Sequence, residues 1–137
     1  MANFSLDPRL AAESFSLGDL ALCEVRLFDD ARFPWLILVP KRDGAAEIID
    51  LEDDERPVLM NEIEIASAAL KRITNCHKLN VAALGNQVRQ LHVHVIARFE
   101  NDAAWPQPVW GKGTRVAYHA DSRDALSKQL RDALNLA

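Results

Sequence analysis

His92 and His94 lie two residues apart in the apolar stretch Gln90–Ile96. On a β-strand, side chains at i and i+2 point to one face, so the two imidazoles are expected roughly 6–7 Å apart there. In this pattern Gln90 shares their face. A neutral imidazole is a good nucleophile toward phosphorus near pH 7, and a neighbouring ring N–H can meet charge on phosphate oxygens. The residues between them are apolar and suit burial under helices: Leu91, Val93 and Val95.

The histidine pair has three interpretations: a core or surface pair without chemical role, a metal site, or a catalytic site. A lone histidine on a strand is usually structural, whereas a pair on one face after a Gly-Asn turn is less ordinary. A metal needs at least a third ligand. The nearby candidates have no spacing that forms a recognised cluster with the pair: Cys76, His77 and His119. We therefore expect neither a metal nor a cofactor.

Length and composition indicate the class of protein. The chain has 137 residues, 49% of them hydrophobic, which suits one domain with a real core. Its net charge of -4 argues against a general affinity for nucleic acid. The longest apolar run, residues 35–40, is far shorter than the ~20 residues of a membrane helix, so no membrane partner is expected. The two cysteines lie far apart and no secretory signal is visible, which favours a reducing cytoplasm.

The first forty residues predict a short helix and a hairpin. Residues 8–14 read as a helical stretch, and residues 20–28 alternate between apolar and polar types as in a half-buried strand. Asp29–Arg32 reads as a turn. Residues 35–39 form an apolar second strand that Pro40 ends. These two strands are predicted to pair antiparallel.

From Asp53 the apolar residues recur at spacings of four and three, which predicts a long helix. Its stripe consists of Leu59, Ile63, Ala66, Leu70 and Ile73. Residues 79–84 then predict a strand, Gly85-Asn86 a tight turn, and residues 88–98 the strand of the histidines.

The last third of the chain predicts a loop and a closing helix. Trp105–Gly111 holds too many prolines for a strand. Asp121 or Ser122 can cap a helix with the stripe Leu126, Leu130 and Leu134. We expect one domain over residues 1–137, with a core at about 20–110 and a C-terminal helix at about 122–135.

Residues 85–96 resemble the signature of the histidine triad (HIT) family, His-φ-His-φ-His-φ-φ after a Gly-rich turn, where φ is apolar. Trp105-Pro106 is similar to the family's tryptophan-containing tail. The resemblance implies an α+β, HIT-like fold, in which an antiparallel sheet of about five strands carries a long helix and terminal helices. It also implies a homodimer, because two subunits of the family usually join their sheets.

The same resemblance implies nucleotide binding and hydrolysis or transfer of a nucleotidyl group at the α-phosphate. The family's nucleophile corresponds to His92, whose Nε2 would attack phosphorus while its other ring nitrogen donates to a backbone carbonyl. His94 would donate to the phosphate oxygens.

Other residues are expected to bind the nucleotide. Phosphate donors are expected from the backbone near Gly85 and Asn86 and from the amides of Gln87 and Gln90. Asp29 is a candidate ribose ligand by location, and Trp105 joins the nucleotide site through the tail resemblance.

The chain departs from the family pattern in several places. Gln90 stands where the first triad histidine is expected, Trp35 where the family often has a separate histidine, and Gln87 where it often has Ser or Thr. Because an amide cannot deliver a proton at neutral pH, a leaving group already stable as an anion, such as phosphate, is expected. Two alternatives stay open: a non-catalytic nucleotide-binding dimer, and a structural or metal-binding β-domain.

Overall fold

Five strands form one antiparallel sheet in the computed structural model, which describes residues 4–136. Their order across the sheet is β1-β2-β3-β5-β4. The strands are β1 (Ser14–Asp19), β2 (Cys23–Phe28), β3 (Trp35–Pro40), β4 (Lys78–Ala82) and β5 (Val93–Arg98). The helices are α1 (Pro8–Glu13), α2 (Glu55–Thr74) and α3 (Ala120–Leu134), with a short 3-10 turn at Ile48–Asp50. The predicted α+β fold with a five-stranded sheet is confirmed.

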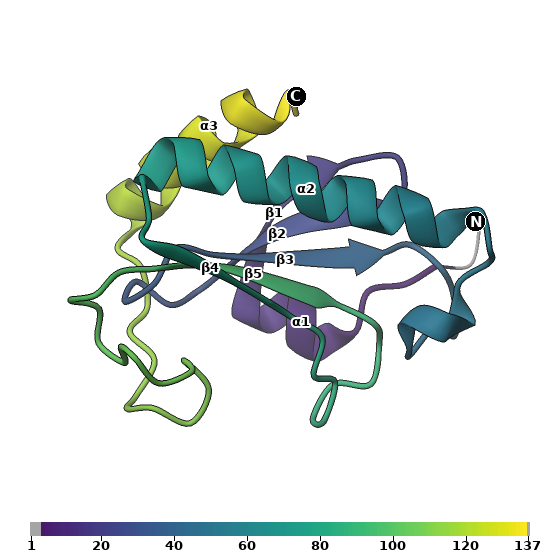
Figure 1. Ribbon diagram of the computed structural model, residues 1–137, viewed down its shortest axis with the longest axis horizontal. Coiled ribbons are helices and arrows are strands. Elements are labelled where there is room, and N and C mark those ends of the chain that lie inside the picture. The colour runs from purple at the N-terminus through teal and green to yellow at the C-terminus, as the bar shows by residue number, and fades with distance from the viewer. Residues whose placement is uncertain (1–3, 137) are drawn as a thin grey trace.

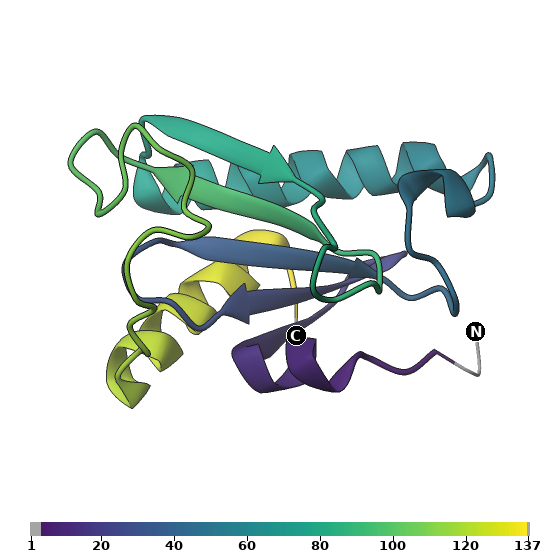
Figure 2. The same cartoon turned by 90° about the horizontal axis from the view of Figure 1, so that it is seen from below.

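The helices cover the two faces of the sheet unequally. α2 and α3 lie on one face and the short α1 lies on the other (Figures 1 and 2). Because side chains alternate along a strand, β3 and β5 each supply two separate cores. The core under α2 includes Leu36, Leu38, Val93 and Val95. The opposite core includes Trp35, Ile37, Val39 and Ile96, and His94 lies on this second face.

The long helix α2 follows its sequence pattern. Glu55 lies in its first turn, and Lys71 and Arg72 lie in its last. Each charge there interacts favourably with the helix dipole. The predicted stripe is buried at Leu59, Ala66 and Leu70. Glu62 is also buried, and its carboxylate accepts the backbone N–H groups of Leu22 and Cys23. These bonds attach α2 to the start of β2.

β1 was not predicted from the sequence. It pairs with β2, but its register shifts between Ser16 and Gly18. Gly18 has φ +131°, a conformation that side chains with a Cβ rarely adopt. Only two apolar residues, Phe15 and Leu17, alternate before Gly18, which is too short a pattern to indicate a strand. The sheet therefore begins at Ser14, before the predicted start of the core at residue 20.

The predicted tight turn at Gly85-Asn86 is wrong. β4 ends at Ala82 and β5 begins at Val93, so residues 83–92 form a longer connection. Val88 packs into the core on the α1 side, while Leu91 packs into the core under α2 and donates its N–H to the carbonyl of Ala45. A two-residue turn could not place side chains in the cores on both faces of the sheet.

The C-terminal helix begins slightly earlier than predicted. Its N-cap is His119 rather than Asp121 or Ser122. Leu130 and Leu134 of its predicted stripe are buried. Residues 1–3 and 137, which belong to the predicted domain, lie outside the described residues. No helix within residues 4–136 is long and apolar enough to cross a membrane.

The two edges of the sheet differ. At the β1 edge, the guanidinium of Arg131 on α3 donates to the backbone carbonyls of Ser16 and Leu17, at 3.1 and 3.2 Å. At the opposite edge, β4 pairs with β5 alone among the described strands, and Val81 is 47% exposed. Within residues 4–136, Arg131 thus occupies part of the β1 edge, whereas the outer side of β4 has no neighbouring strand.

Candidate functional site

A pocket of about 410 Å³ opens between α1, the connection 83–92 and the sheet face that carries His94. It brings together most of the predicted site residues: Gly85, Asn86, Gln87, His92 and His94. Gly85 has φ +72°, a left-handed conformation that glycine adopts without strain, and this bends the connection around the pocket. The two histidines are nearly buried, with 7% and 6% of their surfaces exposed.

His92 is held by one ring nitrogen. Its Nδ1 lies 2.7 Å from the backbone carbonyl of Gln90. A carbonyl can only accept, so Nδ1 carries the proton and the neutral ring keeps its lone pair on Nε2. This is the nitrogen that a nucleophile would use.

His94 is held in the opposite tautomer. The indole Nε1–H of Trp35 donates to His94 Nδ1 at 2.9 Å. Because an indole only donates, His94 Nδ1 accepts and the proton of the neutral ring lies on Nε2. Burial, and secondarily the neighbouring His92, lower the pKa of His94 to about 3. His94 is therefore a neutral N–H donor near pH 7.

The two rings lie close together with their Nε2 atoms available. Their centroids are 4.9 Å apart and their planes meet at 71°. No residue within 4–136 forms a hydrogen bond with either Nε2 atom. In that part of the chain every fully buried side-chain nitrogen or oxygen has a partner, so the two Nε2 atoms are not fully buried. The pair thus offers one lone pair and one N–H at the same pocket.

Aromatic side chains line the apolar part of the pocket. Trp35 packs on Phe28 with ring centroids 4.3 Å apart, and Trp110 meets the His94 ring edge-on at 5.1 Å. Trp105 lies elsewhere, against His77. The sequence singled out Trp105, but the loop after β5 brings Trp110 to the pocket instead.

Gln90 and Asp29 lie outside the pocket. The Gln90 side chain accepts the N–H of Asp7 at 2.8 Å and donates to the carbonyl of Ser5 at 2.9 Å. β5 begins only at Val93, so the alternation that put Gln90 beside the histidines does not reach it. The Asp29 carboxylate accepts the N–H of Tyr118 at 2.9 Å and is paired with Arg115.

Arg9 and Glu13 of α1 also line the pocket, and neither was predicted from the sequence. Arg9 donates from Nη2 to Gln87 Oε1 at 2.7 Å, and its Nε lies 3.5 Å from Glu13. Arg9 is the one Lys or Arg among the described residues that line this pocket. No local motif pointed to it, because α1 reaches the pocket through contacts with residues far along the chain, such as Gln87 and Gln90.

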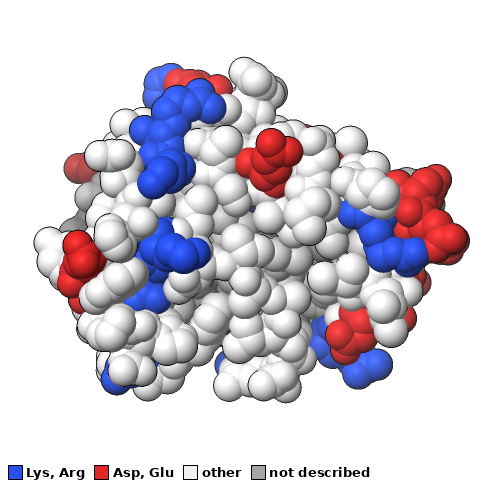
Figure 3. Space-filling model, in the orientation of Figure 1, with Lys and Arg blue, Asp and Glu red and all other residues white. Residues whose placement is uncertain are grey.

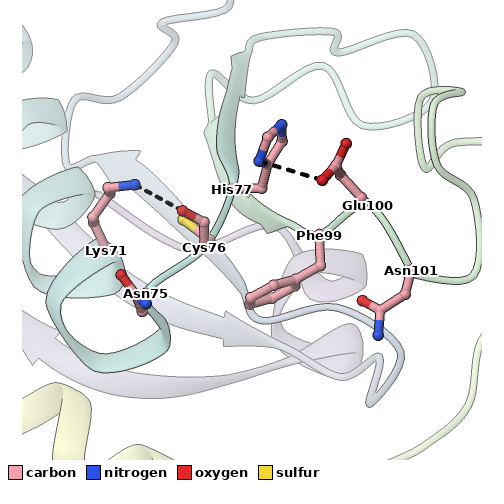
Figure 4. Close-up of a pocket in the computed structure, with 7 residues that line it drawn as sticks. All are labelled: Lys71, Asn75, Cys76, His77, Phe99, Glu100 and Asn101. Carbon is pink, nitrogen blue, oxygen red and sulfur yellow. Dashed lines mark hydrogen bonds and ion pairs between the residues drawn. The ribbon is translucent and has the colours of Figure 1, made fainter.

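A second hollow, of about 650 Å³, is wider and lies at the end of α2 (Figure 4). Its polar groups face one another rather than a shared point: Lys71 donates to the carbonyl of Cys76 at 2.7 Å, and His77 faces Glu100 at 3.9 Å. Within residues 4–136, no group of three or more His, Cys, Asp or Glu could hold a metal ion. The smaller pocket with the histidine pair is therefore the candidate site, despite the greater volume of the other.

Comparison with known proteins agrees with this geometry. The family model described as the HIT domain matches residues 9–101, which is more than half of the chain. The chain belongs to the HIT domain family. Members of this family are generally nucleotide-binding hydrolases or transferases. No curated protein matches the chain.

Three solved HIT proteins share the whole fold, each with a TM-score of 0.94. A histidine triad protein from Bradyrhizobium japonicum is 50% identical and covers 96% of this chain and 98% of its own. One from Sinorhizobium meliloti is 42% identical, with coverage of 97% and 98%. One from Marinobacter aquaeolei is 41% identical, with coverage of 98% and 98%.

Proposed function

We propose that this HIT protein is a nucleotidyl hydrolase or transferase that acts at the α-phosphate of a nucleotide conjugate through a covalent intermediate on His92. The observation that carries the proposal is the complementary pair of rings. His92 Nε2 has a lone pair at the pocket, and His94 Nε2 has a proton there. Attack on phosphorus needs both an attacking lone pair and a donor for the phosphate oxygens.

The reaction would proceed in two displacements. His92 Nε2 attacks the α-phosphorus, a P–N bond forms, and the bond to the leaving group breaks with its electron pair on the leaving group. The Nδ1–H bond to the Gln90 carbonyl stabilises the positive charge that develops on the ring. Water, or another acceptor, then attacks phosphorus, the P–N bond breaks, and the acceptor's proton is released to solvent. No metal and no cofactor takes part in these steps.

We further propose that Gln90 replaces the first histidine of the triad. This replacement limits which leaving groups the enzyme can expel. The Gln90 amide cannot deliver a proton, and its two polar atoms are already bonded to the backbone of Asp7 and Ser5. Neutral His94 is a donor but not a charged acid. We therefore expect phosphate or pyrophosphate as leaving group in preference to an amine, which must be protonated as it leaves.

The rest of the pocket suits the parts of a nucleotide. The backbone at Gly85 and Asn86 and the amide of Gln87 line the pocket and would supply hydrogen-bond donors to phosphate oxygens. Phe28 and Trp110 offer an apolar surface for a base. Asp29 and Trp105 are no longer part of the proposed site, since their side chains lie outside this pocket.

Product release and adduct formation test the proposal. The purified protein is mixed with dinucleoside polyphosphates, nucleoside diphosphates and nucleoside phosphoramidates, and release of nucleoside monophosphate is followed by chromatography. We expect turnover, faster with the phosphate leaving groups, and a nucleotidyl adduct on His92 in a quenched sample by mass spectrometry. His92→Asn should abolish both. The matched control His77→Asn changes a histidine outside the pocket and should leave turnover unchanged.

The second candidate function is a non-catalytic nucleotide-binding dimer, which the commitment of Gln90 to the N-terminal backbone favours. It predicts that nucleoside monophosphates bind equally to wild type and His92→Asn in calorimetry, with no adduct and no turnover. That result would exclude the covalent mechanism and leave the binding role.

We also infer that two copies pair through β4 in the cytoplasm. The open edge of β4 and its half-exposed Val81 support pairing, because unpaired strand edges readily add another strand. On the face that α2 and β4 present in Figure 1, charged side chains lie mainly toward the margins (Figure 3). Cys23 and Cys76 are both free thiols, which suits a reducing compartment.

A further inference from the structure

We propose that Trp35 is a positioning residue that holds His94 as an Nε2–H donor facing the pocket. Its effect on turnover rests on the proposed function above, whereas the tautomer of His94 can be measured without any substrate. The carrying observation is the 2.9 Å bond from the indole Nε1–H to His94 Nδ1.

The sheet places this tryptophan beside His94. β3 pairs antiparallel with β5, Ile37 opposite His94 and Trp35 opposite Ile96. Trp35 and His94 are therefore diagonal neighbours on one face, within reach of a large aromatic side chain. The indole is 4% exposed and packs on Phe28, so the surrounding side chains hold its orientation.

The chemical nature of the indole decides the tautomer. A histidine at position 35 could either donate to His94 or accept from it, which would leave both tautomers of His94 possible. An indole nitrogen has a proton and no available lone pair. His94 Nδ1 must therefore accept, and the proton of the neutral ring must lie on Nε2.

This bond makes the two histidines chemically different although both are imidazoles on one face. The Gln90 carbonyl keeps a proton on His92 Nδ1, and Trp35 keeps one off His94 Nδ1. His94 then has no lone pair at the pocket and cannot compete as nucleophile. The division between attacking ring and donating ring thus follows from two neighbours, one an acceptor and one a donor.

Trp35 also opposes protonation of His94, because a second proton on Nδ1 would face the indole N–H. On this side of the sheet, Lys78 of β4 donates to the backbone carbonyl of Leu79, and the charged side chains of α1, β2 and β5 form ion pairs. Arg9 contacts Glu13 on α1, Arg26 of β2 contacts Glu24, and Arg98 of β5 contacts Asp102. His92 is the other titratable neighbour, and its proximity also lowers the pKa of His94. Burial lowers the pKa of His94 in the same direction.

Nitrogen NMR tests the inference directly. Long-range proton–nitrogen spectra of uniformly ¹⁵N-labelled protein distinguish protonated from unprotonated ring nitrogens. In wild type we expect His94 Nδ1 unprotonated and Nε2 protonated, with no titration down to about pH 4. Trp35→Phe keeps a buried aromatic ring but removes the donor. In this variant we expect a mixture of His94 tautomers and a titration that moves to higher pH.

Two further variants separate hydrogen bonding from packing. Trp110→Phe changes the other indole beside His94, for which the structure gives ring contact but no hydrogen bond, and should leave the His94 tautomer unchanged. Trp35→His can still donate and should restore part of the Nε2–H population. A wild-type His94 that is protonated on Nδ1, or a tautomer unchanged in Trp35→Phe, would overturn the proposal.

Kinetics then connect the tautomer to turnover. If Trp35 orients the donor, Trp35→Phe should lower kcat by about 10- to 100-fold with KM nearly unchanged, because the donor acts mainly on charge that develops in the transition state. Trp35→His should recover part of that loss. A protein with the expected tautomer but no turnover of any conjugate contradicts the proposed function and leaves the role of Trp35 in place. Turnover that Trp35→Phe leaves intact contradicts the positioning role of Trp35 in the reaction.

Discussion

The buried neutral ring of His94 makes stability depend on pH. The pKa of His94 is about 3 in the folded chain, against an ordinary value of 6.5. Between these two values the unfolded chain binds a proton at this site that the folded chain does not. The contribution of neutral His94 is therefore complete above about pH 6.5 and is lost as the pH falls toward 3, at about 1.4 kcal/mol per pH unit.

A comparison of wild type with His94→Gln measures this contribution. Between about pH 7 and about pH 4.5, we expect the free energy of unfolding of wild type to fall by about 2–3 kcal/mol more than that of His94→Gln, which has no imidazole to protonate at this position. Urea unfolding at each pH gives the values. A difference that does not vary with pH would contradict the neutral state of His94.

The sequence predicted the histidine pair but not the partners that set its chemistry. Two imidazoles at i and i+2 can be found by local spacing alone, and five of the predicted residues line one pocket. The bond between Trp35 and His94 joins residues 59 positions apart, and it depends on the pairing of β3 with β5. Nor could spacing decide between Trp105 and Trp110, because both lie in a loop without regular periodicity.

At the scale of elements, α1 brings a positive charge to the pocket. Arg9 Nη2 donates to Gln87 Oε1 at 2.7 Å, and Arg9 is the one Lys or Arg among the described residues of the pocket lining. Its guanidinium is therefore the group that we expect to bind a phosphate leaving group. We expect Arg9→Gln to raise KM for conjugates with a phosphate leaving group by about 10-fold, because a charge-assisted hydrogen bond is worth about 1.5–3 kcal/mol. Steady-state kinetics at low and high salt would measure this, and screening should reduce the difference at high salt.

The control is Arg123→Gln on α3, which removes the same charge from a helix that does not line the pocket. Its KM should equal that of wild type. An equal rise in both variants would mean that Arg9 acts only through the overall charge of the protein.

Gln90 connects the N-terminal segment to the start of β5. Its side chain bonds the backbone of Asp7 and Ser5, and Asp7 caps α1 by accepting the N–H of Arg9. We expect Gln90→Ala to lower the free energy of unfolding by about 1 kcal/mol, since the partly buried N–H of Asp7 loses its acceptor and the exposed carbonyl of Ser5 loses a donor.

Denaturant unfolding measures the effect of Gln90→Ala, and Gln107→Ala is its control. The Gln107 side chain is exposed and its backbone carbonyl, not its amide, accepts from Arg98. It should stay within about 0.5 kcal/mol of wild type. Equal stabilities of the two variants would show that the Gln90 bonds contribute little.

Elements with regular periodicity were predicted well, and irregular ones were not. The stripe of α2 and the hairpin of β2 and β3 are confirmed. Each could be predicted because its apolar residues follow a regular pattern: helical spacings in α2, alternation in β2 and an uninterrupted run in β3. β1 was missed since only Phe15 and Leu17 alternate before Gly18, where the register shifts. The connection 83–92 was predicted too short, because the two cores that it serves are formed by distant parts of the chain.

At the scale of the whole molecule, pairing through β4 is the property to test. Val81→Lys adds a charge to the exposed side of β4, a feature that blocks edge-to-edge pairing. Light scattering after size-exclusion chromatography should find wild type as a dimer and Val81→Lys as a monomer. Val116→Lys changes an equally exposed valine in the loop before α3 and should remain a dimer. A monomeric wild type would contradict the proposed pairing.

If two copies pair through β4 as proposed, the difference between the two edges of the sheet would limit the size of the assembly. Arg131 already occupies the carbonyls of Ser16 and Leu17 on β1, which disfavours the addition of another strand at that edge. A monomer with one open edge strand can pair with a second copy about a twofold axis, and the dimer then buries the open edge of both copies. Growth is then self-terminating, and fibres built by repeated strand addition are disfavoured.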